Sequence, residues 1–132
     1  MKNYSLSKIT IKNAQYYAYH GVRKEEQKLG GKYEVDLELW YDAKPAFIKD
    51  DVNFALNYEE AMFCISEVIL NEQYNLLETI ANEILSQAME KFEILKKASV
   101  RVRKHSVPLR RAVDYVEVEQ YISRLDSDKI EE

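Results

Sequence analysis

Alternating apolar and polar residues mark two segments in the first third of the chain. Residues 33–41 alternate apolar side chains with mostly acidic ones, which is the period-two pattern of a half-buried strand. The first 20 residues predict another long strand, which ends at His20-Gly21. Lys8 and Lys12 would face the acidic side of the second strand. We therefore expect the two strands to pair in antiparallel orientation.

Two helices are predicted in the middle of the chain. Asn57 is a suitable N-cap residue, and Glu60 follows three residues later as its reciprocal partner. Asn75 and Glu78 repeat this arrangement before the second helix. Each pair precedes a stripe of apolar residues at helical spacing, and the second stripe runs from residue 77 to 92. Both helices should bury that stripe against the same core.

The last part of the chain predicts two further strands with complementary charges. Arg101 and Arg103 alternate with valines, and so do Glu117 and Glu119. An antiparallel pairing would place Arg101 opposite Glu119 and Arg103 opposite Glu117. The basic residues of this region are thus expected to form an ion-paired strand face.

The order of elements is β-β-α-α-β-β, which indicates an α+β fold with two helices on one face of an antiparallel sheet. Residues 23–32 and 43–56 are predicted as connecting loops. Residues 1–124 form a single predicted domain, and residues 125–132 a polar tail. Four strands leave two open sheet edges, which proteins usually cover, and closing several sheets into a ring would cover them.

Composition narrows the possible functions of this 132-residue chain. Its net charge of −4 argues against a nucleic-acid partner. Cys64 is the only cysteine, and His20 and His105 are the only histidines, so a metal site is poorly supported. The chain shows no secretory signal, no membrane span and no glycine-rich phosphate loop. We expect a cytoplasmic protein.

Five polar or aromatic residues permit both a structural and a chemical interpretation. Lys104 falls in the inward phase of its strand, where it either ends the strand exposed or reaches into a pocket as a proton donor. Glu78 is either a helix-capping partner or an anchor for a ligand. Pattern alone favours an exposed loop carboxylate for Glu26, a core position for Tyr58 and a turn position for His20.

Four segments, taken in order, resemble the dihydroneopterin aldolases. They are YAYHGVRKEEQKLGGKYEVDLEL (17–39), DDVNFALNY (50–58), NLLETIANEI (75–84) and VRVRKHSVPL (100–109). The resemblance implies the tunnelling fold, in which four β-β-α-α-β-β units close into a barrel-like ring. It also implies a tetramer or a stacked octamer with active sites between subunits.

The same resemblance implies a lyase of folate biosynthesis that needs neither metal nor cofactor. Its substrate is 7,8-dihydroneopterin, which a retro-aldol reaction converts to 6-hydroxymethyl-7,8-dihydropterin and glycolaldehyde. The imine of the pterin ring accepts the electrons of the broken bond, in place of a lysine Schiff base or a zinc ion.

The family's working residues correspond to five positions of this chain. By resemblance, Glu78 and the backbone N–H near Leu77 would hold the pterin. Lys104 would transfer protons, and Glu26 would orient Lys104 or relay a proton through water. Tyr58, from the adjacent subunit, would contact the substrate and protonate the carbon left by cleavage.

Two departures and three alternatives accompany this resemblance. Gly31 stands where many members of the family have glutamine. Residues 105–108 are His-Ser-Val-Pro, where the family usually has Pro-x-Ala-Pro after the lysine. A same-fold epimerase of dihydroneopterin or its triphosphate would break the same bond, and Arg110 and Arg111 are the only hint of a triphosphate rim. The zinc enzymes of this fold, such as pyruvoyl-tetrahydropterin synthase, are disfavoured by the two isolated histidines. A ring-forming binding module without catalysis is the third alternative.

Overall fold

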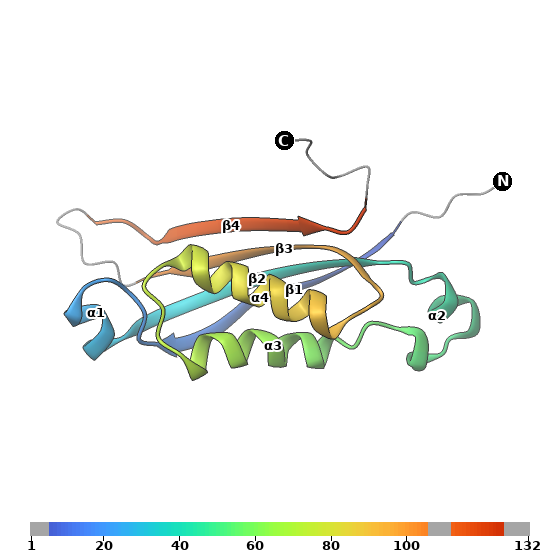
Figure 1. Cartoon of the computed structure of the whole chain (residues 1–132), viewed down its shortest axis with the longest axis horizontal. Helices are drawn as coiled ribbons and strands as arrows, with labels where there is room; N and C mark the ends of the chain where they lie inside the picture. Colours follow the sequence, from blue (N-terminus) through green and yellow to red (C-terminus); the bar gives the residue numbers. More distant parts are fainter. Residues whose placement is uncertain (1–5, 106–111, 126–132) are drawn as a thin grey trace.

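The computed structural model describes residues 6–105 and 112–125, which form one antiparallel sheet with helices against one of its faces (Figure 1). The strands are β1 (Ser7–Ala18), β2 (Gly31–Tyr41), β3 (Leu95–Lys104) and β4 (Val116–Ser123). They lie in the order β1-β2-β3-β4, and each neighbouring pair is antiparallel. The predicted α+β class and the predicted antiparallel pairs β1–β2 and β3–β4 are confirmed, and the pairing of β2 with β3 completes the sheet.

The two long helices are α3 (Tyr58–Asn71) and α4 (Leu77–Lys91). Asn57 caps α3 as predicted, because its side-chain oxygen accepts the N–H groups of Glu59 at 3.0 Å and Glu60 at 3.4 Å. The predicted cap of α4 is wrong. Leu76, rather than Asn75, is the N-cap residue, and no side chain caps this helix. Glu78 is consequently the second helical residue instead of the third.

The core lies between these helices and the inner face of the sheet. Alternate residues of the two central strands contribute one side, and the periodic stripes of the helices contribute the other. Its fully buried side chains include Val35, Leu37, Val100, Val102, Ile65, Ile69, Ile80 and Ile84. Tyr58, predicted as a core residue, is exposed, so the core side of α3 begins at Ala61.

Both segments predicted as loops contain short helices. These are α1 (Lys24–Leu29), α2 (Lys44–Lys49) and the 3₁₀ helix η1 (Val52–Phe54). Helix α1 has no buried residue, and α2 has one, Ala46. A helix of one or two turns that buries so little carries no apolar stripe, which explains why periodicity missed it.

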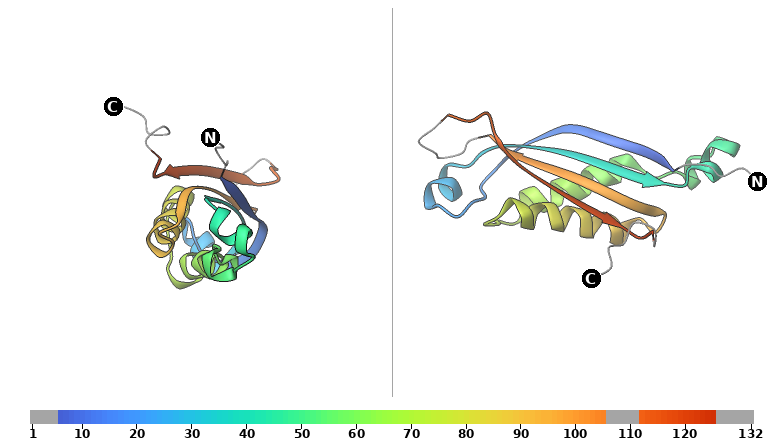
Figure 2. Two further views of the ribbon diagram at one scale, coloured as in Figure 1. Left: turned by 90° about the vertical axis from the view of Figure 1, so that its right-hand side faces the viewer. Right: turned by 90° about the horizontal axis from the view of Figure 1, so that it is seen from above.

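The outer face of the sheet carries the predicted charge pairs. Arg101 Nε lies 2.7 Å from Glu119 Oε2, and Lys8 Nζ lies 2.7 Å from Glu38 Oε2. Figure 2 shows that the helices leave this outer face uncovered. The outer edges of β1 and β4 pair with no other strand among the described residues. Of the predicted tail, residues 126–132 lie outside the described residues. No helix within the described ranges is long and apolar enough to cross a membrane.

Candidate functional site

Lys104 marks a cluster of polar groups at one end of the sheet. It is the last residue of β3 and lies in the same phase as Val100 and Val102, with its side chain 11% exposed. Its Nζ forms an ion pair with Glu26 Oε2 and donates to the carbonyl of His20 at 3.3 Å. The inward orientation considered for this lysine is confirmed, and the exposed alternative is wrong.

Helix α1 carries Glu26 to the lysine. The Glu26 side chain is 12% exposed and belongs to a helix. The prediction of an exposed carboxylate in a loop is therefore wrong in both its exposure and its secondary structure. The second oxygen of Glu26 accepts the backbone N–H of Arg23 at 3.2 Å, which fixes the carboxylate at the start of the helix. Gly21 makes this approach possible, since a Cβ there would lie 2.5 Å from Glu26 Cδ. Gly21 also has φ +137°, a conformation that other residues rarely adopt.

The surroundings of Lys104 favour proton exchange. Burial lowers the pKa of the Lys104 ammonium, because a charged group loses hydration there. The ring of Tyr33 lies 5.9 Å from Lys104 Nζ. Burial also raises the pKa of Tyr33 to about 12, so its hydroxyl remains a donor, and it bonds the His20 carbonyl at 3.0 Å. Lys104 is thus the residue at this end of the sheet best placed to give up and regain a proton.

His20 holds three elements together, a role that the predicted turn position did not include. Its ring is buried, and Nε2 donates to the carbonyl of Ile69 at 2.8 Å while Nδ1 accepts the N–H of Tyr74 at 3.0 Å. The backbone donor of Tyr74 requires an unprotonated Nδ1, so the imidazole is neutral with its hydrogen on Nε2. Burial, with a smaller contribution from the Lys104 charge, lowers the pKa of His20 and favours the same state.

The start of α4 lies at this end of the sheet as well. Gly21 N donates to the carbonyl of Tyr74 at 2.9 Å, and this bond and the His20 contact fix the segment that precedes the helix. Leu77 is half-buried against the core, whereas Glu78 is exposed. The Glu78 carboxylate is therefore open to solvent in a single chain. It remains free of the predicted cap and is available to a ligand.

Helix α3 begins at the end of the molecule near α2, away from α1 (Figure 1), and Tyr58 is its first residue. Ile69, near the end of that helix, contacts His20. Eleven residues of α-helix span about 16 Å, so one chain does not bring Tyr58 to Lys104. The side chain of Tyr58 is 57% exposed, which contradicts its predicted core position. A site containing both residues would need two chains.

Metal ligands do not gather within the described residues. No group of three histidine, cysteine, aspartate or glutamate side chains there is placed to hold a metal ion. The ring nitrogens of His20 bind backbone groups, and Nε2 of His105 binds Glu34. The polar groups near Lys104 are instead donors and acceptors for protons.

Comparisons of the sequence with known proteins point to one family. The sequence model described as dihydroneopterin aldolase matches residues 9–121. Dihydroneopterin aldolase 1 of Arabidopsis thaliana is 31% identical over 92% of this chain and 84% of its own length. Dihydroneopterin aldolase of Bacillus subtilis is 32% identical over 79% of this chain and 87% of its own length.

Solved structures with similar folds include two described as dihydroneopterin aldolases. A protein from Vibrio cholerae assigned to that activity superposes with a TM-score of 0.82 at 27% identity, covering 92% of this chain and all of its own. The Escherichia coli enzyme, solved with neopterin, gives a TM-score of 0.75 at 22% identity, covering 86% of this chain and 98% of its own. The second likeness shows a shared fold.

Proposed function

Because this chain belongs to the dihydroneopterin aldolase family, we infer that it is the lyase of folate biosynthesis that cleaves 7,8-dihydroneopterin. The products are 6-hydroxymethyl-7,8-dihydropterin and glycolaldehyde. The observation that carries this inference most directly is the buried ion pair of Lys104 and Glu26, at the end of β3. By the resemblance, Lys104 and Glu26 correspond to the family's acid–base residues, and their contact supports the proposal.

The substrate supplies the electron sink for the reaction. A base takes the proton of the side-chain 2′-hydroxyl, the bond between the first and second side-chain carbons breaks, and glycolaldehyde leaves. The electron pair of that bond moves into the ring imine, whose nitrogen takes up a proton, and an enamine forms. A proton delivered to the side-chain carbon, with loss of the proton on the ring nitrogen, then gives the hydroxymethyl product. The protein has to orient the pterin and move these protons.

Lys104 is the residue that we assign to these proton transfers. Burial lowers the pKa of its ammonium, which makes the neutral amine more accessible than on an exposed lysine. The Glu26 carboxylate and the His20 carbonyl hold Nζ from two sides. In this proposal Glu26 orients the amine and relays a proton through water.

Glu78 and Leu77 form the proposed pterin anchor at the start of α4. An exposed carboxylate at this position is free to accept two hydrogen bonds from the amidine edge of the pterin. The backbone N–H groups of the first helical turn have no partner within the helix, so the one near Leu77 is available to the ring. The His20 and Gly21 bonds to Tyr74 set the position of this anchor relative to Lys104.

Tyr58 completes the proposed site from a neighbouring subunit. Its exposure and its distance from Lys104 along α3 both agree with a site formed between chains. The uncovered edges of β1 and β4 favour a ring of four chains, or two stacked rings, in the cytoplasm. In such a ring Tyr58 would protonate the enamine carbon of a substrate held by the adjacent chain.

Product analysis tests the proposed function. The purified protein, treated with a chelator, is incubated with 7,8-dihydroneopterin and separately with its triphosphate, and the pterin products are separated by chromatography. We expect the hydroxymethyl pterin and glycolaldehyde to form without added metal. An epimer as the sole product, or activity that requires zinc, would overturn the assignment. Arg110 and Arg111, the predicted triphosphate contacts, lie outside the described residues, so this assay decides whether the triphosphate reacts.

A matched pair of lysine variants tests the role of Lys104 in the same assay. Lys104→Met should lower kcat about 10²- to 10⁴-fold while pterin binding is retained, because it removes the proton-transfer group. Lys96→Met, at the other end of β3, should keep kcat within about twofold. Equal losses in the two variants would show that Lys104 has no special role.

A further inference from the structure

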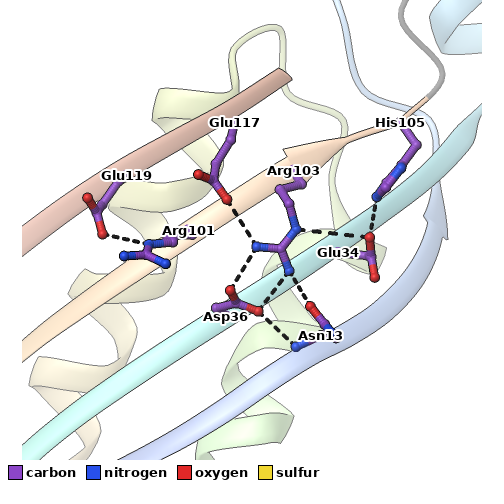
Figure 3. A network of polar contacts seen from close by, with 8 residues as sticks. All are labelled: Asn13, Glu34, Asp36, Arg101, Arg103, His105, Glu117 and Glu119. Atoms are coloured by element: carbon purple, nitrogen blue, oxygen red, sulfur yellow. Dashed lines mark hydrogen bonds and ion pairs between the residues drawn. The ribbon is translucent and has the colours of Figure 1, made fainter. Parts of the chain in front are cut away.

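The residues on both sides of Lys104 bind one carboxylate on the opposite face of the sheet. Arg103 Nε lies 3.9 Å from Glu34 Oε1, and His105 Nε2 contacts the same oxygen (Figure 3). Glu34 lies on β2, one residue after Tyr33, which is the register partner of Lys104. We name Glu34, Arg103 and His105 the strand-end clamp.

The clamp is well packed. The side chains of Arg103 and Glu34 are 9% and 13% exposed, and that of His105 is 26% exposed. The ring of Tyr115 lies beside both Arg103 and His105, with its centroid 5.5 Å from that of the His105 ring and 5.9 Å from the guanidinium carbon of Arg103. Partial burial strengthens such contacts, because solvent screens them less than it screens surface pairs.

Arg103 also binds residues of the other three strands, which connects the clamp to the rest of the sheet (Figure 3). Its two terminal nitrogens donate to both oxygens of Asp36, at 2.7 and 2.8 Å. One of them also bonds the side-chain oxygen of Asn13 on β1 at 2.6 Å, and the other bonds Glu117 on β4 at 3.0 Å. A single guanidinium thus ties β3 to its neighbours β2 and β4 and, across β2, to β1.

A backbone hydrogen bond also fixes the residue that follows Lys104. His105 N–H donates to the carbonyl of Lys32 at 3.0 Å, so the ladder between β2 and β3 continues one residue beyond Lys104. Lys104 therefore has a fixed residue on either side. Its own side chain points to the helix face, where it meets Glu26 and the His20 carbonyl.

We propose that Glu34 is a positioning residue for the cleavage reaction, acting on Lys104 through Arg103 and His105. A strand end without such a clamp frays, and the long lysine side chain amplifies each displacement of its backbone. An error of about 1 Å in the position of a reacting group costs up to about a hundredfold in rate. This inference rests on the proposed role of Lys104.

Glu34→Ala removes the shared acceptor, and Glu38→Ala is its matched control. Glu38 lies on the same strand and face and is also ion-paired, with Lys8, but its partner does not flank Lys104. Three properties of each variant are measured: the rate of hydrogen exchange at the amide of His105, kcat, and the dissociation constant for neopterin.

Glu34→Ala should speed exchange at the His105 amide about tenfold and lower kcat about ten- to a hundredfold, with neopterin affinity within about twofold. Glu38→Ala should leave all three within about twofold. Glu34→Gln, which keeps an acceptor oxygen in place, should restore most of the kcat.

Three results would overturn the inference. Unchanged exchange in Glu34→Ala would show that the clamp does not hold the strand end. Faster exchange with normal kcat would show that Lys104 does not depend on it. Equal losses in Glu34→Ala and Glu38→Ala would indicate a general effect on folding. A wild-type protein that fails to cleave dihydroneopterin would refute the proposed function instead, and hydrogen exchange would still test the clamp.

Discussion

Replacing His20 with phenylalanine tests whether the buried imidazole joins the parts of the site. Phenylalanine keeps a ring of similar size but removes both nitrogens. The carbonyl of Ile69 then loses its partner, and because α3 ends at Asn71 it has no partner within the helix either. The N–H of Tyr74 loses its acceptor as well. His20→Phe therefore leaves two backbone groups unpaired.

The expected cost follows from these two groups. A buried polar group left without a partner costs about 1–3 kcal/mol. Two such groups give about 2–6 kcal/mol, and we expect a value of about 2–4 kcal/mol because Tyr74 is only partly buried and water can reach its N–H. The variant should also weaken pterin binding, since the segment before Leu77 loses one of its two ties to the end of β1.

His20 should also make the stability of the folded protein depend on pH. Burial lowers the pKa of His20 below its usual 6.5, so the folded state prefers the neutral ring. This contribution to stability is fully present above pH 6.5 and is lost as the pH falls through the lower pKa of the folded state. Below pH 6.5 the wild type should lose stability faster than His20→Phe, and the two curves should approach each other.

Urea unfolding at one fixed protein concentration measures both effects, because assembly makes stability depend on concentration. His105 and the carboxylates are common to both proteins, so their contributions cancel in the difference. A His20→Phe protein within about 0.5 kcal/mol of wild type at pH 7.5 would refute the structural role. A difference in unfolding free energy between the two proteins that stays constant from pH 7.5 to 5 would refute the preference of the folded state for the neutral His20 ring.

Three other variants probe neighbouring features. Gly21→Ala should destabilise the protein by roughly 1–3 kcal/mol and lower kcat, as its Cβ would displace Glu26; normal activity in a kinetic assay would contradict that geometry. Glu78→Gln should keep its unfolding midpoint but weaken pterin binding by about ten- to a hundredfold, measured by calorimetry; unchanged affinity would remove Glu78 from the site. Asp36→Asn should cost about 2–4 kcal/mol in denaturant unfolding because it leaves Arg103 buried with weaker partners, and a cost near zero would refute this pairing.

Periodicity predicted the strands and long helices because each buries a regular set of apolar residues. The alternation of residues 33–41 matched the buried face of β2, and the arginines of β3 met the glutamates of β4 in the predicted register. The predicted ring of chains is a property of several copies, and one chain does not test it. The short helices α1 and α2 escaped prediction because they bury almost nothing.

The candidate site was predicted less completely, since contacts between distant segments decide it. Alternation left two orientations open for Lys104, and the approach of Glu26 from α1 decided between them. The start of α4 follows backbone bonds to Gly21 rather than the capping pattern at Asn75. His20 continues the inward phase of β1 after Ala18, and this alternation was the signal that would have identified it as buried.

Subunit mixing tests the central claim, that Lys104 of one chain and Tyr58 of its neighbour form one active site. Tyr58→Phe and Lys104→Ala proteins, each with little activity alone, are mixed under conditions that allow chains to exchange. Random exchange leaves about a quarter of the sites with both wild-type residues, so activity should rise to about a quarter of the wild-type value. Exchange that is demonstrated by mass spectrometry but restores no activity would show that the two residues do not act together across an interface.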